Sequence, residues 1–369
     1  MIKVCHMTSA HGAEDVRIFH KECVSLAKEG YEVFLVQRGG SYNKSGVNIV
    51  GVGDIPSSRL RRMTSGAKKV YKAALALDCD VYHFHDPELL PYGLKLKKKG
   101  KKVIFDSHEY TRKQIFIKHY IPKSVAKLVS RLYARFEDYV ISKIDGVIIP
   151  CPVDGVFPFR SKNGIYIDNV PKLEEFYDKY RPAERKEPNT VCYIGSLTYE
   201  RGVQHLVEAA YKADCRVLFG GKLSPESFKQ KIMEMPESRN SVFLGFLDRE
   251  QVQDTIMRSN VGVSTLLNVA QYDNPGNLST KVYEYMSMCI PVILTRNEFD
   301  ERMIETYKFG KCVDPENIEE FASVLRELLD DPEKARELGE NGRKAVRDHF
   351  NWENEEKKLF EFYKTVLGR

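Results

Sequence analysis

Short apolar runs alternate with amphipathic segments through the first half of the sequence. The apolar runs are Ile2–Met7, Tyr31–Val36, Val81–Phe84 and Val103–Phe105. They have the length of buried strands in a parallel sheet. Between the first two runs, apolar residues recur at helical spacing from Arg17 to Glu29, and Gly30 follows, where a helix commonly ends. The repeated order of strand, helix and strand predicts a doubly wound α/β sheet.

The same order returns after a proline-rich interval. Residues 150–188 contain six prolines and lose the periodicity, so we expect a domain boundary there. We assign 1–170 to a first Rossmann-like domain and 171–345 to a second. The last segment, 346–369, is predicted to be a helix that packs back on the first domain.

One stretch of the second half combines a loop, a helix start and a buried strand. Asp273–Asn277 is a cluster of turn-forming residues, and Ser279 or Thr280 offers an N-cap for the next helix. Lys281 and Glu284 are neighbours in the first turns of that helix, where N–H groups and the dipole favour an anion. A nucleoside diphosphate would fit, with Lys281 on phosphate and Glu284 on ribose. An ion pair on a solvated surface fits the same spacing.

Polar side chains collect where first-domain strands end. His83, His85, Asp86 and Glu88 lie around the end of one strand, and His108 follows the next. Two histidines and two carboxylates resemble a metal cluster. In an extended segment, however, His83 and His85 point to one face, and they lack helical ligand spacing, so we favour a polar strand end. His108 is the best-placed imidazole for contacting a substrate, with a structural histidine as the alternative.

Glycine-rich turns follow several strands and would let backbone approach phosphates. Arg201 and Lys222 follow two such turns in the second half and are candidate phosphate cations. The first loop, SAHGAEDVR, lacks the GxGxxG fingerprint, which disfavours a dehydrogenase. Asp15 and Arg17 in that loop are candidate ligands, or else residues that cap and begin the helix.

The charge distribution indicates a class of binding partner, and the cysteine pattern indicates a cellular compartment. Residues 1–170 carry 28 Lys and Arg against 17 Asp and Glu, net +11, and the remainder is net −6. A basic half suits an anionic ligand, a membrane surface or a nucleic acid, and equally a merely solvated surface. Ile117–Tyr139 is amphipathic with a basic polar face, as in an interfacial helix or a core helix. Eight scattered cysteines without a CxxC pair suggest a reducing compartment and no zinc site.

The chain resembles the family-4 retaining glycosyltransferases of the GT-B fold over nearly its whole length. The resemblance is carried by HGAEDVRIFHKECVSLAKEGYEV, HDPELLPYGLKLKKKGKKVIFDSHE, IGSLTYERG and LSTKVYEYMSMCIPVI. It implies two Rossmann-like doubly wound domains facing a cleft. The second would bind a nucleotide sugar and the first an acceptor.

The resemblance also implies roles for single residues. His108 would contact the transferred sugar, Arg201 and Lys281 would stabilise the departing diphosphate, Glu284 would bind ribose, and Gly12 would approach the phosphates. The other implied donor contacts are Ser196, Phe246, Leu247, Asn277, Ser279 and Thr280.

Two positions depart from the family pattern. Ser196 stands where the family often has a basic residue. The family often has two glutamates separated by seven residues, and Gly276 stands at the first of these positions, eight before Glu284. The second departure puts the sugar contacts in doubt more than nucleotide binding.

The implied function is retaining transfer of a sugar from a nucleoside diphosphate sugar to an acceptor hydroxyl. UDP is the expected nucleotide and GDP its rival. We expect a lipid-linked saccharide acceptor in exopolysaccharide or capsule assembly, and a cytoplasmic protein that is peripheral on the inner face of an anionic membrane. No metal, further cofactor or nucleic acid is expected. A nucleotide-sugar epimerase or hydrolase on the same scaffold, and a non-catalytic nucleotide- or polyanion-binding protein, stay open as alternatives.

Overall fold

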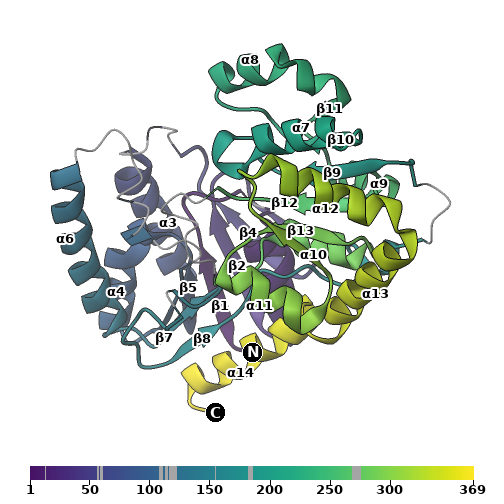
Figure 1. The fold of residues 1–369 in the computed structure, drawn as a ribbon. Coiled ribbons are helices and arrows are strands. Elements are labelled where there is room, and N and C mark those ends of the chain that lie inside the picture. Colours follow the sequence, from purple (N-terminus) through teal and green to yellow (C-terminus); the bar gives the residue numbers. More distant parts are fainter. Residues whose placement is uncertain are drawn as a thin grey trace. The chain divides into compact units, whose positions relative to one another are not determined.

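The computed structural model divides the chain into two α/β units (Figure 1). The first is Met1–Asn169 with Asn354–Arg369, and the second is Val170–Glu353. The structure describes residues 1–12, 14–55, 58, 61–107, 111–112, 115, 123–153, 155–181, 186–267 and 276–369. Each unit is built on a largely parallel sheet, which confirms the predicted fold class. The chain returns to the first unit at Asn354, whereas the sequence placed the start of that segment at 346.

The first unit holds an eight-stranded sheet in the order β3-β4-β2-β1-β5-β6-β7-β8. All neighbours are parallel except β3 and β4. The strands are β1 (Lys3–Met7), β2 (Glu32–Gln37), β3 (Tyr42–Lys44), β4 (Val47–Gly51), β5 (Val81–Phe84), β6 (Lys102–Asp106), β7 (Gly146–Ile149) and β8 (Gly164–Tyr166).

The helical segments of this unit lie on both faces of the sheet. They are η1 (Val16–Cys23), which is π-helical, α1 (Val24–Lys28), η2 (Arg62–Gly66), α3 (Ala67–Ala76), η3 (Pro87–Leu89), α4 (Leu90–Lys98), α6 (Lys123–Ile141) and most of α14 (Trp352–Leu367). Strand alternation fixes which residues meet which layer. The Tyr82 hydroxyl donates to the Ala74 carbonyl in α3, whereas His83, one residue on, contacts Tyr363 of α14.

The second unit holds a six-stranded parallel sheet in the order β11-β10-β9-β12-β13-β14. Its strands are β9 (Thr190–Ile194), β10 (Arg216–Gly220), β11 (Ser241–Gly245), β12 (Val261–Ser264), β13 (Val292–Thr295) and β14 (Gly310–Val313). Its helical segments are η4 (Tyr177–Lys179), η5 (Tyr199–Arg201), α7 (Val203–Lys212), α8 (Glu226–Glu234), η6 (Pro236–Asn240), α9 (Arg249–Arg258), α10 (Thr280–Ser287), α11 (Glu298–Tyr307), α12 (Ile318–Asp330) and α13 (Pro332–Asp348). Because the strands are parallel, their carboxyl ends share one edge, where α/β sheets bind ligands.

Helix α10 is fixed to this sheet by one buried tyrosine. The Tyr285 hydroxyl accepts from the Ile194 amide at 2.8 Å and donates to the Val263 carbonyl at 3.4 Å, which joins α10 to both β9 and β12. The Tyr285 ring lies against Gly262 of β12, where an added Cβ would stand 2.5 Å from two ring atoms. Glycine at 262 therefore sets how closely α10 approaches the strand.

A Gly262→Ala substitution should destabilise the second unit by about 1–3 kcal/mol, because the added methyl overpacks the Tyr285 ring. Denaturant unfolding followed by circular dichroism measures the change. Gly40→Ala is the control, since that position has open space for a Cβ, and it should change stability by less than about 0.5 kcal/mol. Equal effects of both substitutions would contradict this packing account.

Candidate functional site

The two charged residues of α10 are both buried, which excludes the solvated ion pair that the sequence left open. Lys281 is 8% exposed and Glu284 is 5% exposed. Glu284 Oε1 accepts from Arg249 Nη1 at 2.9 Å. A buried lysine and a separately paired glutamate at a helix start require a different explanation from surface charge.

The Lys281 ammonium lies over the Tyr193 ring, with Nζ 3.6 Å from the ring centroid. Among the residues that the structure describes, no atom accepts a hydrogen bond from this Nζ. Burial lowers the pKa of Lys281 well below its ordinary value, and the positive charge of Arg201 lowers it further, against the opposing pull of Glu284. A buried ammonium without an acceptor is unfavourable in the free protein, so this arrangement favours a bound anion.

Glycine turns bring backbone close to the Lys281 ammonium. Gly195 has a φ of +128°, and a Cβ there would lie 3.7 Å from Lys281 Nζ. Gly221 has a φ of +148°, and its Cβ would lie 1.8 Å from the Gly195 carbonyl oxygen. The Gly195 amide donates to the Gly220 carbonyl at 2.8 Å. Only glycine permits two turns this close, which leaves the ammonium beside bare backbone at the carboxyl edge of the sheet.

A second cation lies at the end of the same loop. Arg201 ends η5, and its carbonyl accepts from the Thr265 hydroxyl at 3.2 Å. Gly202 follows with a φ of +67°, and a Cβ there would meet Thr265 Oγ1 at 2.9 Å. The hydroxyl contact holds the loop against the segment after β12. The effect of Arg201 on the Lys281 pKa shows that the two cations act on the same region.

Glu284 is oriented by an ion pair with Arg249, a residue that the sequence analysis did not identify. Arg249 begins α9 and bridges Glu284 to Glu175, whose Oε2 accepts from Nη2 at 2.6 Å. The guanidinium also lies 4.6 Å from the Phe176 ring centroid. Position 249 carries no sequence signal for this role, because its partners come from two other segments.

The start of α10 lies where the sequence predicted it. Ser279 is the N-cap residue of α10, as expected, although its side chain makes no capping hydrogen bond. Its hydroxyl instead contacts Ser264 Oγ at 3.1 Å, which ties the helix start to the end of β12.

The remaining five predicted positions differ in exposure. Ser196 is exposed after β9, and Phe246 is 89% exposed after β11. Leu247 packs toward Gly220, where a Cβ would stand 2.5 Å from Leu247 Cδ1. Asn277 and Thr280 are partly buried at the start of α10. Phe246 thus offers an open apolar surface at the edge where the charged residues collect.

The structure places the predicted residues of the first unit in different environments. His108 lies outside the described residues, and Gly12 has open space around its Cα. Asp15 caps η1 by accepting from the amides of Arg17 and Ile18. Arg17 is not a ligand at the surface: it is buried and donates to both oxygens of Asp106 at 3.0 and 3.2 Å.

The strand-end cluster is divided between two networks. Asp86 Oδ2 accepts from the Thr8 hydroxyl and the Ser9 amide, and Glu88 accepts from Ser9 Oγ and Arg62. His83 and His85 do share one face, as predicted, with ring centroids 4.7 Å apart. Their ring nitrogens lie near Glu22 and, for His85, also near Asp106.

Two family models match the two units of the chain. The model for glycosyltransferase family 4 matches residues 17–154, and the model for group 1 glycosyl transferases matches residues 177–345. The chain belongs to the GT-B glycosyltransferases of family 4. This confirms the resemblance that the sequence motifs carried.

Curated relatives share part of this glycosyltransferase's sequence. Alpha-D-kanosaminyltransferase of Streptomyces kanamyceticus is 27% identical over 180 residues, which cover 47% of this chain and 44% of that protein. MMP alpha-(1->4)-mannosyltransferase of Mycolicibacterium hassiacum is 24% identical over 200 residues, covering 52% and 46%. These matches span about half the length of each relative.

Solved structures share the whole fold. Sucrose-phosphate synthase from Thermosynechococcus elongatus superposes with a TM-score of 0.78 at 17% identity, covering 100% of both chains. Anabaena HepE in complex with UDP and glucose gives 0.72 at 12% identity, covering 99% of this chain and 100% of that one. At these identities the likeness establishes the fold alone.

Replacing Lys281 by methionine should stabilise the ligand-free glycosyltransferase by about 1–3 kcal/mol at pH 7, because it removes a buried ammonium without an acceptor. The folded pKa is lowered, so the unfolded state binds more protons, and wild-type stability rises with pH between the two pKa values. The difference between variant and wild type should therefore shrink toward pH values above about 10.4. Denaturant unfolding across pH measures it.

Lys222→Met is the matched control, since Lys222 is an exposed lysine after β10 of the same sheet. Its stability should follow the wild type at every pH. A Lys281→Met variant that is less stable than wild type at pH 7 would show that the ammonium is satisfied in the free protein.

Proposed function

We propose that this protein transfers a glycosyl group from a nucleoside diphosphate sugar to an acceptor hydroxyl, and that the second unit binds the donor. The observation that carries the proposal is the buried Lys281 ammonium, which has no hydrogen-bond acceptor among the described residues and lies beside glycine turns at the carboxyl edge of the sheet. A diphosphate supplies the missing acceptors. Its charge also suits the amides at the start of α10.

The chemistry follows from where negative charge develops. The bond between the anomeric carbon and the diphosphate oxygen breaks, and the acceptor oxygen forms the new bond to that carbon while its proton passes to the departing phosphate. Lys281, Arg201 and the amides near the start of α10 stabilise the charge on the leaving diphosphate. Because these cations are fixed before the reaction, little reorganisation is needed at the transition state.

Retention of configuration is part of the proposal. In it, the acceptor attacks on the face from which the diphosphate departs, without a nucleophilic side chain. The names of two relatives specify alpha transfers. In this proposal His108 positions the sugar.

Glu284 is proposed to bind the ribose of the nucleotide. Arg249 fixes Oε1, which holds the carboxylate in one orientation at the edge of the sheet. A carboxylate accepts from both neighbouring hydroxyls of a ribose. Uridine is the proposed base, supported by the UDP present in the structurally similar HepE.

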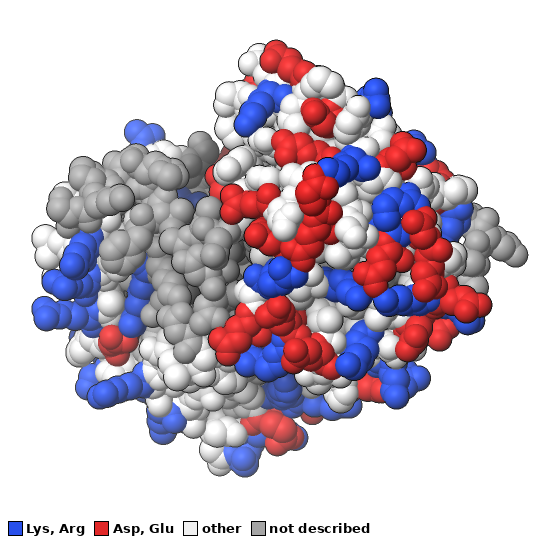
Figure 2. Space-filling model, in the orientation of Figure 1, with Lys and Arg blue, Asp and Glu red and all other residues white. Residues whose placement is uncertain are grey.

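The acceptor is proposed to be presented at an anionic membrane, as on a lipid-linked saccharide. Helix α6 exposes apolar side chains at helical spacing, with Leu128 60% exposed. The exposed stripe comprises Val125, Leu128, Val129, Leu132, Phe136 and Tyr139. In Figure 2, Lys and Arg side chains gather where Figure 1 places α6.

Lys127, Arg131 and Arg135 flank this stripe and are exposed. An apolar stripe bordered by basic residues is the composition of a helix that lies in a membrane interface. None of the helices within the described parts of the chain is long and apolar enough to cross a membrane.

Calorimetric titration tests the donor proposal. The wild type should bind UDP more tightly than GDP, and Glu284→Gln should weaken UDP binding about tenfold or more, roughly 1.4 kcal/mol. Glutamine keeps an acceptor for Arg249 and loses the negative charge. Glu234→Gln, at an exposed position of α8, should bind UDP like the wild type.

A folded wild type that binds neither nucleotide would contradict the proposal. Incubating UDP-sugars with and without an acceptor then separates a transferase from a hydrolase or epimerase, since only transfer requires the acceptor in the product.

Sedimentation with vesicles tests the membrane contact. At low salt the wild type should bind vesicles with anionic lipid and not neutral ones. A Leu128→Gln, Leu132→Gln double variant should bind about tenfold or more weakly, since each leucine loses roughly 1.5–3 kcal/mol of apolar burial. Met233→Gln removes an equally exposed apolar side chain from α8 and should leave binding unchanged. Absence of wild-type binding to anionic vesicles would remove the membrane from the proposal.

A further inference from the structure

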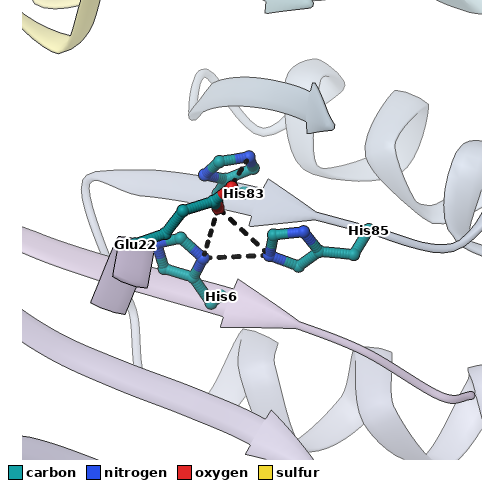
Figure 3. A group of neighbouring side chains, drawn as sticks. All are labelled: His6, Glu22, His83 and His85. Carbon is teal, nitrogen blue, oxygen red and sulfur yellow. Dashed lines mark hydrogen bonds and ion pairs between the residues drawn. The ribbon is translucent and has the colours of Figure 1, made fainter. Parts of the chain in front are cut away.

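Three histidines and a glutamate converge in the core of the first unit (Figure 3). His6 lies on β1 and His83 on the adjacent β5, where the two residues are direct neighbours in the parallel register. His85 follows β5 by one residue and Glu22 comes from η1. Because side chains alternate along a strand, His83 and His85 share the face opposite Tyr82 and Phe84. The sheet register therefore builds the group from segments far apart in the sequence.

The four side chains are fully buried and their inner atoms face a common point. His6 Nδ1, His83 Nε2 and His85 Nε2 lie 3.9, 4.0 and 4.0 Å from Glu22 Oε2. His6 Nδ1 and His85 Nε2 are 2.9 Å apart. One ligand-type atom of each residue lies within 4.8 Å of the others. The side chains of all four have no exposed surface.

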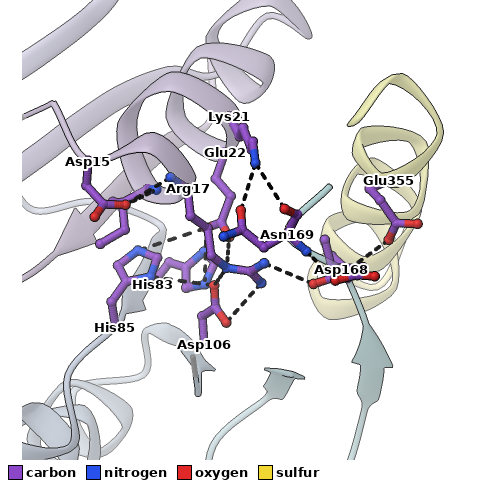
Figure 4. Close-up of polar contacts among 12 residues, drawn as sticks. Asp15, Arg17, Lys21, Glu22, His83, His85, Asp106, Asp168, Asn169 and Glu355 are labelled. Carbon is purple, nitrogen blue, oxygen red and sulfur yellow. Dashed lines mark hydrogen bonds and ion pairs between the residues drawn. The ribbon is translucent and has the colours of Figure 1, made fainter. Parts of the chain in front are cut away.

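The outer ring nitrogens have contacts that fix the rings, and Figure 4 shows His85 beside Asp106. His83 Nδ1 lies 2.9 Å and His6 Nε2 lies 3.3 Å from the Tyr363 hydroxyl. His85 Nδ1 lies 3.6 Å from Asp106 Oδ2. A hydroxyl oxygen can accept from two N–H groups. Outer contacts of this kind orient metal-binding histidines and select the tautomer that turns a lone pair inward.

The inner nitrogens of two rings are close enough to share one partner, since His6 Nδ1 and His85 Nε2 lie 2.9 Å apart. When the protons of both rings are on the outer nitrogens, both inner nitrogens present lone pairs, and a cation between them would bind both. One guanidinium faces two carboxyl groups here, since Arg17 Nε lies 3.0 Å from Asp106 Oδ2 and 3.1 Å from Glu22 Oε1. A divalent cation bound by Glu22 would compensate a buried carboxylate at this place.

We propose that His6, Glu22, His83 and His85 bind one divalent transition-metal ion, for which Zn²⁺ is the best fit. Imidazole nitrogens and a carboxylate are ligands that Zn²⁺ prefers, and four protein ligands without an open position are typical of a structural site. The ion would join β1, η1 and the end of β5. It supplies no step of the glycosyl transfer.

Some distances between the four ligand atoms are shorter than in a tetrahedral metal site, and others are longer. Zinc bonds of about 2.0–2.1 Å separate ligands by about 3.3 Å. The contact between His6 and His85 is shorter than this and the contacts to Glu22 are longer. Movements of under about 1 Å, which side-chain rotation supplies, convert one arrangement into the other.

The proposal departs from the prediction, made from the sequence, that the protein binds no metal. The cysteine pattern and the spacing of His83 and His85 carried that expectation, whereas two of the four ligands come from β1 and η1. The metal proposal does not rest on the glycosyltransferase proposal, since the group lies in the first unit and the donor site in the second.

Metal analysis of the whole protein is the first test. The full chain is produced without a histidine tag in zinc-supplemented medium, purified without chelator, and analysed by inductively coupled plasma mass spectrometry. About one zinc ion per chain is expected. If the purified protein holds no metal, it is unfolded with chelator and refolded with Zn²⁺ or Co²⁺. Failure to take up either ion on refolding overturns the proposal. A proton shared between the histidines would then explain their close contact.

Two variants then locate the ion. Tyr363→Phe removes the hydroxyl that orients two rings and should weaken metal affinity about 10–100-fold. Tyr82→Phe is the matched control, because it removes another buried hydroxyl on the opposite face of the same sheet, and it should keep the metal. Bound Co²⁺ should give the visible bands of a tetrahedral site in the wild type. Equal metal affinity in both variants overturns the assignment to this cluster.

Discussion

A single buried ammonium group is central to the proposed donor region of the second unit. Lys281 is held over the Tyr193 ring at the start of α10, and its environment in the free protein disfavours the charged form. Tyr285 supports this position because it fixes α10 to β9 and β12. The turns at Gly195 and Gly221 bring backbone close to the ammonium without side chains. The buried ammonium lowers the stability of the ligand-free protein, and in our proposal a bound diphosphate compensates this loss. Such a conflict between stability and local structure is a common mark of a binding site.

The two units use the same geometry to different ends. In each, parallel strands bring their carboxyl ends to one edge, and residues just after a strand meet residues from helices far away in the sequence. In the second unit this edge carries cations beside open backbone. In the first unit the sheet interior just below the edge carries imidazoles, two carboxylates and a guanidinium in a closed network. An open edge suits a substrate, and a closed network suits a fixed ion.

Much of the fold follows from local pattern. The strands around His83 and around Val191 were predictable because buried strands are short apolar runs, and the nucleotide interpretation of Lys281 and Glu284 followed from their place in a helix start. Strand β3 was missed because it is short, polar and exposed at the sheet edge. The family resemblance added the identity of the fold, which periodicity alone left open.

The missed contacts share one physical cause. Arg249 binds Glu284, and His6 and Glu22 meet His83, only because of strand register and helix packing. A single sequence specifies which residues turn inward, but it does not state which distant segment faces them. Sequence spacing therefore identified Glu284 without Arg249, and His83 and His85 without His6 and Glu22. His108 was chosen on its position after a strand, and its role stays a prediction.

The most direct test of this account is the pKa of Lys281 itself, measured by NMR of lysine-labelled protein with and without saturating UDP, with the signal assigned through Lys281→Met. The account predicts a pKa well below that of free lysine in the ligand-free protein and a clear rise when the diphosphate binds. A pKa that is already ordinary without UDP, or that stays the same when UDP binds, would contradict the claim that this ammonium awaits an anion.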